Sequence, residues 1–343
     1  MEELVNRFTP IVYMHPEEQF FPVSINWLLQ RSELIDYNVS PNGIKSPTNR
    51  DLYNIAQKYN FQTVKEGDII LSYNEYVYKG QIPMSEVPIY ALYREKDGKK
   101  YITYIILFAY NGTYNIAGIA EVGDHPGDME HLTVELNTDN TLSRVFYSAH
   151  GVKDGRWVDA KDVLFENDKI VAYNALNGHG LYPHEGIAFR FGGFANDYLI
   201  KGQKWEPKAE IIHLKDDPKF NIDTMGWTVY DGRIGGKAIK GNTDGITGFP
   251  DKAWIKAIDN PDKTFYNPPS IIRKSNLYTS STYILRVIIG YFIIYGLIKI
   301  VNNYLKEKSF SISLKVHIIV ILIMLIISMS FRKVIEPILK KYV

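Results

Sequence analysis

The chain has 343 residues, of which 45% are hydrophobic and 22% are charged, and it contains no cysteine. This composition excludes a wholly disordered chain, a collagen-like chain and a polytopic membrane protein. The absence of cysteine excludes disulfide bonds, cysteine-ligated zinc, iron–sulfur clusters and a cysteine nucleophile. The formal net charge of +1, taken by itself, predicts no strong attraction to nucleic acid or to acidic membranes.

The net charge is the sum of two unlike parts. Residues 271–343 carry eleven basic and two acidic side chains, a net +9, whereas residues 1–270 carry 28 basic and 36 acidic side chains, a net −8. An asymmetry of this size indicates two parts with different surroundings. We therefore predict a domain over residues 1–270, a linker over 271–282 and a separate basic segment over 283–343.

The first part is expected to consist mainly of strands. Ser24 is placed to cap a short helix over residues 25–35. Short β-branched or aromatic runs follow, separated by clusters of Gly, Asn and Asp: Tyr101–Ala109, His131–Leu136, Ser143–Ser148 and Ile170–Leu176. Regular short strands with turn residues between them are typical of an antiparallel β-sandwich. We therefore predict a mainly β fold, an antiparallel β-sandwich with a few short helices.

A dense polar cluster, DHPGDMEH over residues 124–131, leads into the second of these strands. Asp128 and Glu130 share the strand parity of Leu132, so both are expected on one face at the mouth of the strand. His125 can fold over from the turn that follows it. Two carboxylates and one imidazole suit Mg²⁺, Ca²⁺ or Mn²⁺ better than a structural zinc ion. The pattern predicts a divalent-cation site at His125, Asp128 and Glu130, with a turn held by Asx-type hydrogen bonds as the alternative.

Other polar side chains are expected at the same rim of the sandwich. His150 and His179 each follow a strand and precede a glycine. Function concentrates in loops held by a rigid scaffold, although any one of these histidines could instead be a structural residue with a satisfied hydrogen bond. The predicted ligand-binding rim comprises Asp124, His131, His150, His179 and Tyr182. In the alternative of a metal-dependent hydrolase, His150 or His179 is the candidate general base.

The basic segment contains two uncharged, mostly apolar runs, Val287–Ile298 and Val316–Phe331. Each run is shorter than the roughly 20 residues that span a bilayer, but flanking Lys and Arg side chains can extend to the headgroups. Counting those flanks, 283–304 and 315–335 are long enough. We predict a transmembrane helical hairpin with a basic tail, and two buried helices of a soluble domain as the alternative. The predicted membrane-edge residues are Arg286, Lys299, Lys315 and Arg332.

The short connector over residues 299–315 would place the N-terminal domain and the C-terminus on the same side of the membrane. The positive-inside rule favours the cytosol for that side, because the connector has fewer basic residues than the flanks. We therefore predict an integral membrane protein with two spans, whose partners are membrane lipids and not nucleic acid. The sequence does not determine its oligomeric state.

Several segments resemble the vacuolar protein sorting-associated protein 62 family. They are the opening Arg7–Glu18 with Phe21-Pro22 and Trp27, the elements Tyr147–Gly151 and Leu176–Pro183, and the segment His125–His131. The last is similar to the family's His-x-Gly-Asp-Trp-Glu-His signature, with Met129 in the Trp position. The resemblance covers roughly residues 5–258 and, by the family's name, implies a role in membrane trafficking.

A more distant likeness is to the necrosis-inducing cytolysins of plant pathogens, whose Gly-His-x-His-Asp-Trp-Glu motif is similar in its His-x-x-Asp-x-Glu spacing to His125, Asp128 and Glu130. Ser148 and His150-Gly151 resemble their Ser-x-His-Gly element. The likeness implies a β-sandwich whose rim holds a divalent cation used in docking to a sphingolipid headgroup. Met129 departs from that motif, and the disulfide of those secreted proteins cannot form in this chain.

These observations favour a membrane-anchored β-sandwich that binds a polar ligand or lipid headgroup through a divalent metal at its rim. A metal-dependent hydrolase is the second hypothesis. The third is a structural membrane protein of a virus or an organelle, because the abundance of Ile, Lys, Asn and Tyr indicates an AT-rich genome such as that of a large DNA virus or a protist.

Overall fold

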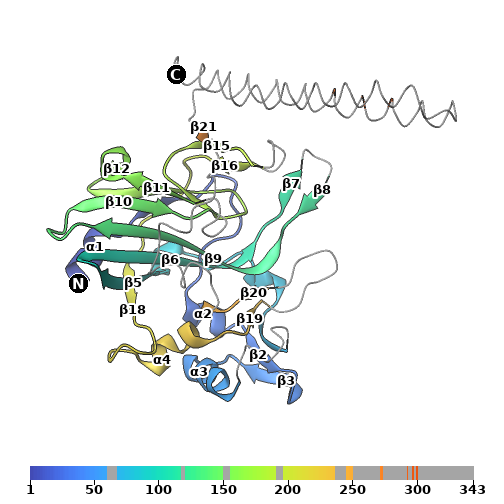
Figure 1. The fold of residues 1–343 in the computed structure, drawn as a ribbon. Helices are drawn as coiled ribbons and strands as arrows, with labels where there is room; N and C mark the ends of the chain where they lie inside the picture. Colours follow the sequence, from blue (N-terminus) through green and yellow to red (C-terminus); the bar gives the residue numbers. More distant parts are fainter. Residues whose placement is uncertain are drawn as a thin grey trace, which may run out of the picture. The chain divides into compact units, whose positions relative to one another are not determined.

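The computed structural model describes residues 1–59, 68–116, 120–149, 155–190, 196–235, 245–249 and 271–272, and the single positions 292, 296 and 299. The chain divides into two compact units, Met1–Ile272 and Arg273–Val343. Figure 1 shows how the strands and helices of the first unit are arranged. The predicted linker and hairpin lie almost entirely outside the described residues. Of the helices in the described residues, none has both the length and the apolar character needed to cross a bilayer.

The centre of the first unit is a six-stranded sheet in the order β11-β10-β9-β6-β5-β18. Its neighbouring strands run antiparallel, except that β18 runs parallel to β5. In chain order the strands are β5 (Ile89–Lys96), β6 (Lys99–Asn111), β9 (His125–Leu136), β10 (Leu142–Tyr147), β11 (Arg156–Asp159) and β18 (Ala209–Ile212).

Two five-stranded sheets accompany the central sheet. The second sheet contains β1 (Ile11–Tyr13), β12 (Phe165–Glu166), β13 (Lys169–Asn174), β14 (Leu181–Tyr182) and β17 (Lys204–Trp205). The third contains β2 (Glu33–Asp36), β3 (Ser40–Lys45), β4 (Ile69–Ser72), β19 (Arg233–Ile234) and β20 (Ile246–Thr247). Two small sheets contain β15 (Gly186–Ala188), β16 (Asp197–Leu199) and β21 (Ile271–Ile272), and β7 (Tyr114–Ile116) with β8 (Ala120–Val122).

Short helices connect these strands. The α-helices are α1 (Glu2–Phe8), α2 (Ile25–Leu29), α3 (Asn49–Lys58) and α4 (Ile222–Met225). The 3₁₀ turns are η1 (Glu75–Val77), η2 (Met84–Glu86), η3 (Ala160–Asp162) and η5 (Gly226–Val229). The expectation of a mainly β protein with a few short helices is therefore confirmed.

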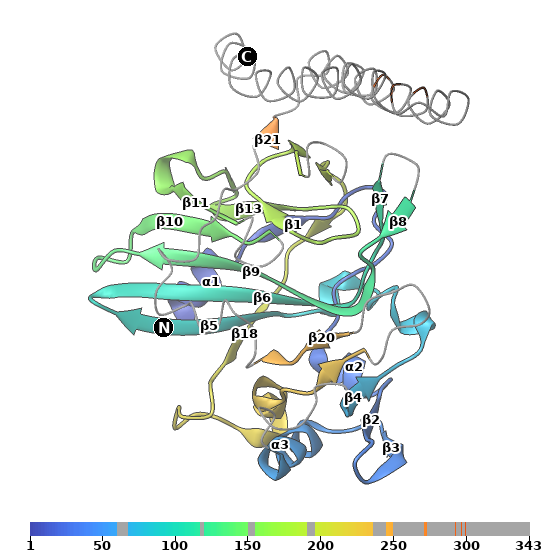
Figure 2. The ribbon, with the colours of Figure 1, turned by 45° about the vertical axis from the view of Figure 1, so that its right-hand side comes forward.

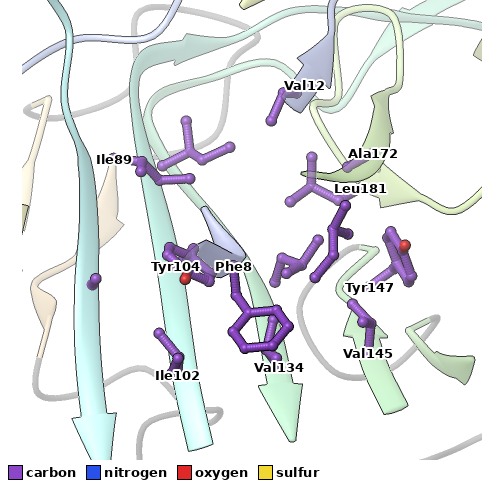
Figure 3. Packing of buried hydrophobic residues seen from close by; sticks show 14 of the residues in the cluster. Phe8, Val12, Ile89, Ile102, Tyr104, Val134, Val145, Tyr147, Ala172 and Leu181 are labelled. Carbon is purple, nitrogen blue, oxygen red and sulfur yellow. The ribbon is translucent and has the colours of Figure 1, made fainter. Parts of the chain in front are cut away.

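The central sheet has a hydrophobic core on each face. On one face, Tyr104 and Val134 pack with Val12 and Ala172 of the second sheet and with Phe8 of α1 (Figure 3). On the other face lie the third sheet and the helices α2 and α3, which Figure 2 shows on the side of the central sheet away from β1 and β13. A simple two-sheet sandwich is thus an incomplete description. The reason is visible in β6, which is buried at every position from Ile102 to Asn111 and so presents apolar side chains to both faces.

The four strands predicted from residues 101–176 form as β6, β9, β10 and β13, and β9 begins six residues earlier than expected, at His125. The helix predicted from Ser24 also forms, and the Ser24 hydroxyl accepts a hydrogen bond from the backbone N–H of Trp27 at 3.3 Å. The helix ends at Leu29 instead of continuing to residue 35. Residues 33–36 instead form β2, because Leu34 is buried in the third sheet, where β2 pairs with β3 and β4.

Candidate functional site

The predicted metal-binding motif lies within strand β9. Asp128 pairs with Phe108 of β6 and Glu130 pairs with Ile106, while Leu132 on the same face belongs to the core between the central and second sheets. Strand parity therefore places both carboxylates on the face toward the second sheet, as expected from the sequence.

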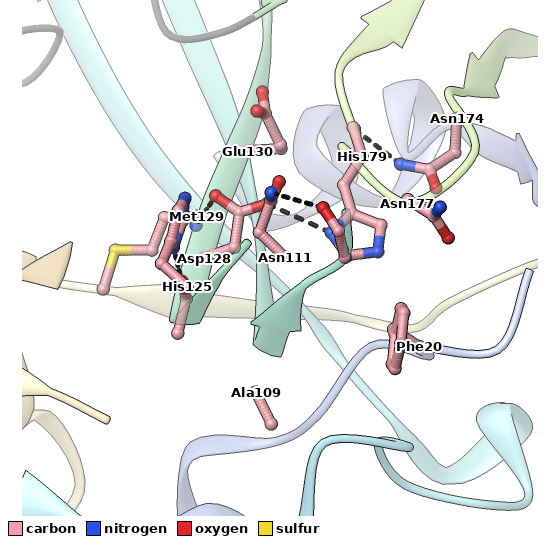
Figure 4. A network of polar contacts seen from close by, with 12 residues as sticks. Phe20, Ala109, Asn111, His125, Asp128, Met129, Glu130, Asn174, Asn177 and His179 are labelled. Carbon is pink, nitrogen blue, oxygen red and sulfur yellow. Dashed lines mark hydrogen bonds and ion pairs between the residues drawn. The ribbon is translucent and has the colours of Figure 1, made fainter. Parts of the chain in front are cut away.

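Two neighbouring strands of the second sheet bring further residues to this place. β1 and β13 run parallel, with Ile11 opposite Val171 and Tyr13 opposite Tyr173. Parallel strands point in the same direction, so the segments that follow β1 and β13 leave the sheet at the same end. Glu18 follows β1 and His179 follows β13, so residues 161 positions apart meet beside Asp128. Figure 4 shows His179 next to Asp128.

The His179 ring is fully buried between two carboxylates. Nδ1 lies 3.1 Å from Oδ2 of Asp128, and Nε2 forms an ion pair with Oε1 of Glu18 at 3.8 Å. The ring is stacked on Phe108, with 3.7 Å between centroids and 2° between planes. Burial lowers the pKa of His179, but the hydrogen bond to Asp128 and the negative charges of Asp128 and Glu18 outweigh burial and raise it to about 9. The imidazole is therefore a cation at neutral pH.

The turn that carries His179 has an unusual backbone. Asn177 and His179 both have positive φ angles, 64° and 55°, a region that residues other than glycine seldom occupy. The conformation is held by hydrogen bonds, including one of 2.6 Å from the side-chain amide of Asn174 to the carbonyl of His179. Gly178 lies between them, where a Cβ atom would stand 1.4 Å from the hydroxyl of Tyr114. Position 178 of this turn therefore has no room for a side chain.

Glu130 adds a third carboxylate to this region. It is 3% exposed and accepts a hydrogen bond of 2.6 Å from the hydroxyl of Ser148. Burial, together with the charge of Asp128, raises the pKa of Glu130 well above its usual value. We call Glu18, Asp128, Glu130 and His179 the His179 cluster. It holds three carboxyl groups and one imidazole.

His125, the third predicted metal ligand, is not brought into this cluster. Its Nδ1 lies 2.8 Å from the carbonyl oxygen of Gly127, so the ring is bonded to its own turn. Within the described ranges, no three His, Asp or Glu side chains are placed to share a metal ion. Asp128 and Glu130 are the part of the predicted ligand set that the structure brings together.

The predicted rim residues are found in several places. Asp124 accepts a 2.7 Å hydrogen bond from the Tyr110 hydroxyl, and Tyr182 donates one to Asp197. His131 is buried near Phe146, with ring centroids 5.6 Å apart, on the opposite side of β9 from Asp128, and burial lowers its pKa to about 3. His150 lies outside the described residues.

The geometry does not favour His179 as a general base. A general base needs a nitrogen that can accept a proton from the substrate. Both ring nitrogens of His179 face carboxylates instead, and the raised pKa keeps the ring protonated at neutral pH. The candidate catalytic role of His150 stays a prediction.

Glu18 is the residue of the cluster that the prediction from sequence missed. It is 6% exposed, and its pKa is lowered because hydrogen bonding and charge from His179, with bonds from backbone N–H groups, outweigh the effect of burial. One signal is present in the sequence: Glu18 belongs to the opening segment that resembles a known family, although that resemblance assigns no chemistry to the segment.

The fold and the site define a β protein with a buried, carboxyl-rich cluster where β9 of the central sheet meets the segments that follow β1 and β13. Comparison with known proteins gives the family. The chain matches the model of vacuolar protein sorting-associated protein 62 over residues 1–194, which is more than half of its length, and so belongs to that family. No protein with curated annotation matches it.

Several solved structures are similar to this chain. A complex of NLPPya with glucosamine is 13% identical, covers 77% of this chain and 90% of its own, and has a TM-score of 0.36. Necrosis and Ethylene inducing Protein 2, from the causal agent of cocoa's Witches Broom disease, is 12% identical, covers 61% and 74%, and has a TM-score of 0.30. Identity and TM-score are both low, so these similarities say nothing about what this chain binds.

Proposed function

We propose that this chain is a membrane-anchored Vps62-family protein that binds a polar ligand at the His179 cluster. The observation that carries the proposal is a pair of buried polar atoms, Oδ1 of Asn174 and Nε2 of His179, that make no hydrogen bond with the described residues. Buried polar atoms in folded proteins are nearly always hydrogen-bonded. A polar ligand or an ordered water would supply the missing partner.

A divalent cation, Mg²⁺, Ca²⁺ or Mn²⁺, is the proposed cofactor, and Asp128 and Glu130 would hold it. These ions prefer carboxylate oxygens. The two side chains lie on one face of β9, and the raised pKa of Glu130 reflects burial and the negative charge of Asp128. A bound ion would neutralise this charge and offer its remaining coordination positions to oxygen atoms of the ligand.

Cation binding is tested by thermal unfolding of the full-length protein in detergent. Any ligand that binds only the folded state raises the melting temperature, so millimolar Mg²⁺, Ca²⁺ or Mn²⁺ is expected to raise it by several degrees. Glu130→Gln should abolish the shift. Asp139→Asn, at an exposed carboxylate in the turn after β9, should keep it. An absent shift, or the same shift in both variants, would contradict the proposal.

We propose further that residues 283–343 anchor the protein as a two-span hairpin, with the N-terminal domain and the C-terminus in the cytosol. The support is the pair of apolar runs bordered by Arg286, Lys299, Lys315 and Arg332. On this view the polar ligand is a lipid headgroup, in keeping with a role in membrane trafficking.

Flotation with liposomes tests the anchor and the headgroup separately. The full chain should float with any bilayer and resist extraction by high salt. A chain ending at residue 282 should float only with the lipid whose headgroup it binds. If the full chain sediments, the proposed membrane anchor is wrong. If the shorter chain sediments with every lipid mixture, the proposed headgroup binding is wrong, and a structural membrane protein becomes the better interpretation.

A further inference from the structure

The side chain of Glu18 ties the loop after β1 to the rest of the site. Its Oε1 accepts hydrogen bonds from the backbone N–H groups of Gln19 and Phe20, both at 2.9 Å. Its Oε2 accepts one from the backbone N–H of Asn177 at 2.8 Å. One buried carboxylate therefore joins two segments that are 159 residues apart in sequence.

A third segment, which contains Gly112 and Thr113, is hydrogen-bonded to Asn177 as well. The backbone N–H of Gly112 donates to the carbonyl of Asn177 at 2.9 Å, and the Asn177 side chain donates to the carbonyl of Thr113 at 2.8 Å. A Cβ atom on Gly112 would lie 2.6 Å from the ring of Phe20. Since Glu18 holds the backbone of both Phe20 and Asn177, its carboxylate is the common point of all three segments.

The same carboxylate faces the His179 ring. Asp128 contacts Nδ1 of the imidazole at 3.1 Å, and stacking on Phe108 sets the plane of the ring. Glu18 faces Nε2 at 3.8 Å, an ion-pair distance without a hydrogen bond. Asp128, in turn, is oriented by His179 and by the backbone N–H of Met129 at 2.8 Å.

We infer that Glu18 is a positioning residue of the binding site: through the backbone of Asn177 it holds the turn that carries His179, and His179 orients Asp128. This inference rests on the proposed function, because it takes Asp128 to be a ligand of the cation. It also gives a role to the opening segment of the chain, which supplies Glu18 from the end of β1.

The test is the affinity of the full-length protein for Mn²⁺, measured by electron paramagnetic resonance. Loss of a group that orients a metal ligand typically costs 10–100-fold in affinity, so Glu18→Gln should weaken Mn²⁺ binding by about that factor at a temperature where it is still folded. Glu17→Gln is the matched control, because Glu17 is adjacent but exposed, and it should bind as the wild type does. Glu18→Asp, which keeps the charge, should recover part of the affinity.

A second measurement reports on the position of the His179 ring. In protein labelled with ¹⁵N-histidine, the ring signals of His179, identified by their absence in His179→Gln, should shift in Glu18→Gln and stay in place in Glu17→Gln. Unchanged His179 signals in Glu18→Gln would overturn the inference. So would unchanged Mn²⁺ affinity in Glu18→Gln, with the proposed function left standing. A wild type that binds no Mn²⁺ would instead refute the cation site itself, and this inference with it.

Discussion

Asp128→Asn is expected to lower the free energy of unfolding by about 3–5 kcal/mol, the cost of removing one partner from a buried ion pair. The substitution preserves size but leaves the imidazolium of His179 facing a neutral amide, and the ring is fully buried. Chemical denaturation of wild type and variant at neutral pH measures the difference.

Asp223→Asn is the matched control. Asp223 also pairs with a cation, Arg50, at 2.7 Å, but both side chains are more than half exposed. Exposed ion pairs contribute about 1 kcal/mol or less, so this variant should be nearly as stable as the wild type. Combining Asp128→Asn with His179→Gln should cost less than the sum of the single changes, because the two side chains are in direct contact. Equal losses of unfolding free energy in Asp128→Asn and Asp223→Asn would show that the buried ion pair of Asp128 and His179 contributes no more to stability than an exposed pair.

The two buried histidines, His179 and His131, are expected to make opposite contributions to the pH dependence of stability, one lost above pH 6.5 and the other lost below it. The pKa of His179 is raised from 6.5 to about 9 in the folded protein, so its contribution is complete below pH 6.5 and is lost as the pH rises toward 9. The pKa of His131 is lowered from 6.5 to about 3 by burial, so its contribution is complete above pH 6.5 and is lost as the pH falls toward 3. At its limit, each pKa shift changes the free energy of unfolding by about 3–5 kcal/mol.

Urea unfolding at a series of pH values, with two variants, separates the two slopes. His179→Gln should flatten the profile between pH 6.5 and 9 and leave the acidic side unchanged. His131→Leu should flatten the slope between pH 6.5 and 3 and leave the alkaline side unchanged. A wild-type profile that is level from pH 6.5 to 9 would show that His179 is not held as a cation.

Much of the local structure could be predicted because it depends on neighbouring residues. The alternation of apolar side chains in β9 placed Asp128 and Glu130 on one face, and Ser24 marked the start of α2. The end of α2 could not be predicted, because the pairing of β2 with β3 and β4 prevails over the helical pattern. The two separate cores could not be predicted either, because they depend on which distant elements pack against each face of the central sheet.

The sequence by itself determined the type of chemistry available: the lack of cysteine leaves His, Asp and Glu as the charged groups of the site, and strand parity pairs Asp128 with Glu130. Only the tertiary structure decided which histidine joins them. The parallel pairing of β1 with β13 brings Glu18 and His179 to one edge of the second sheet, whereas His125, only three residues from Asp128, bonds to its own turn. Nearness along the chain does not determine contact across a fold, because the register and direction of paired strands set which distant residues meet.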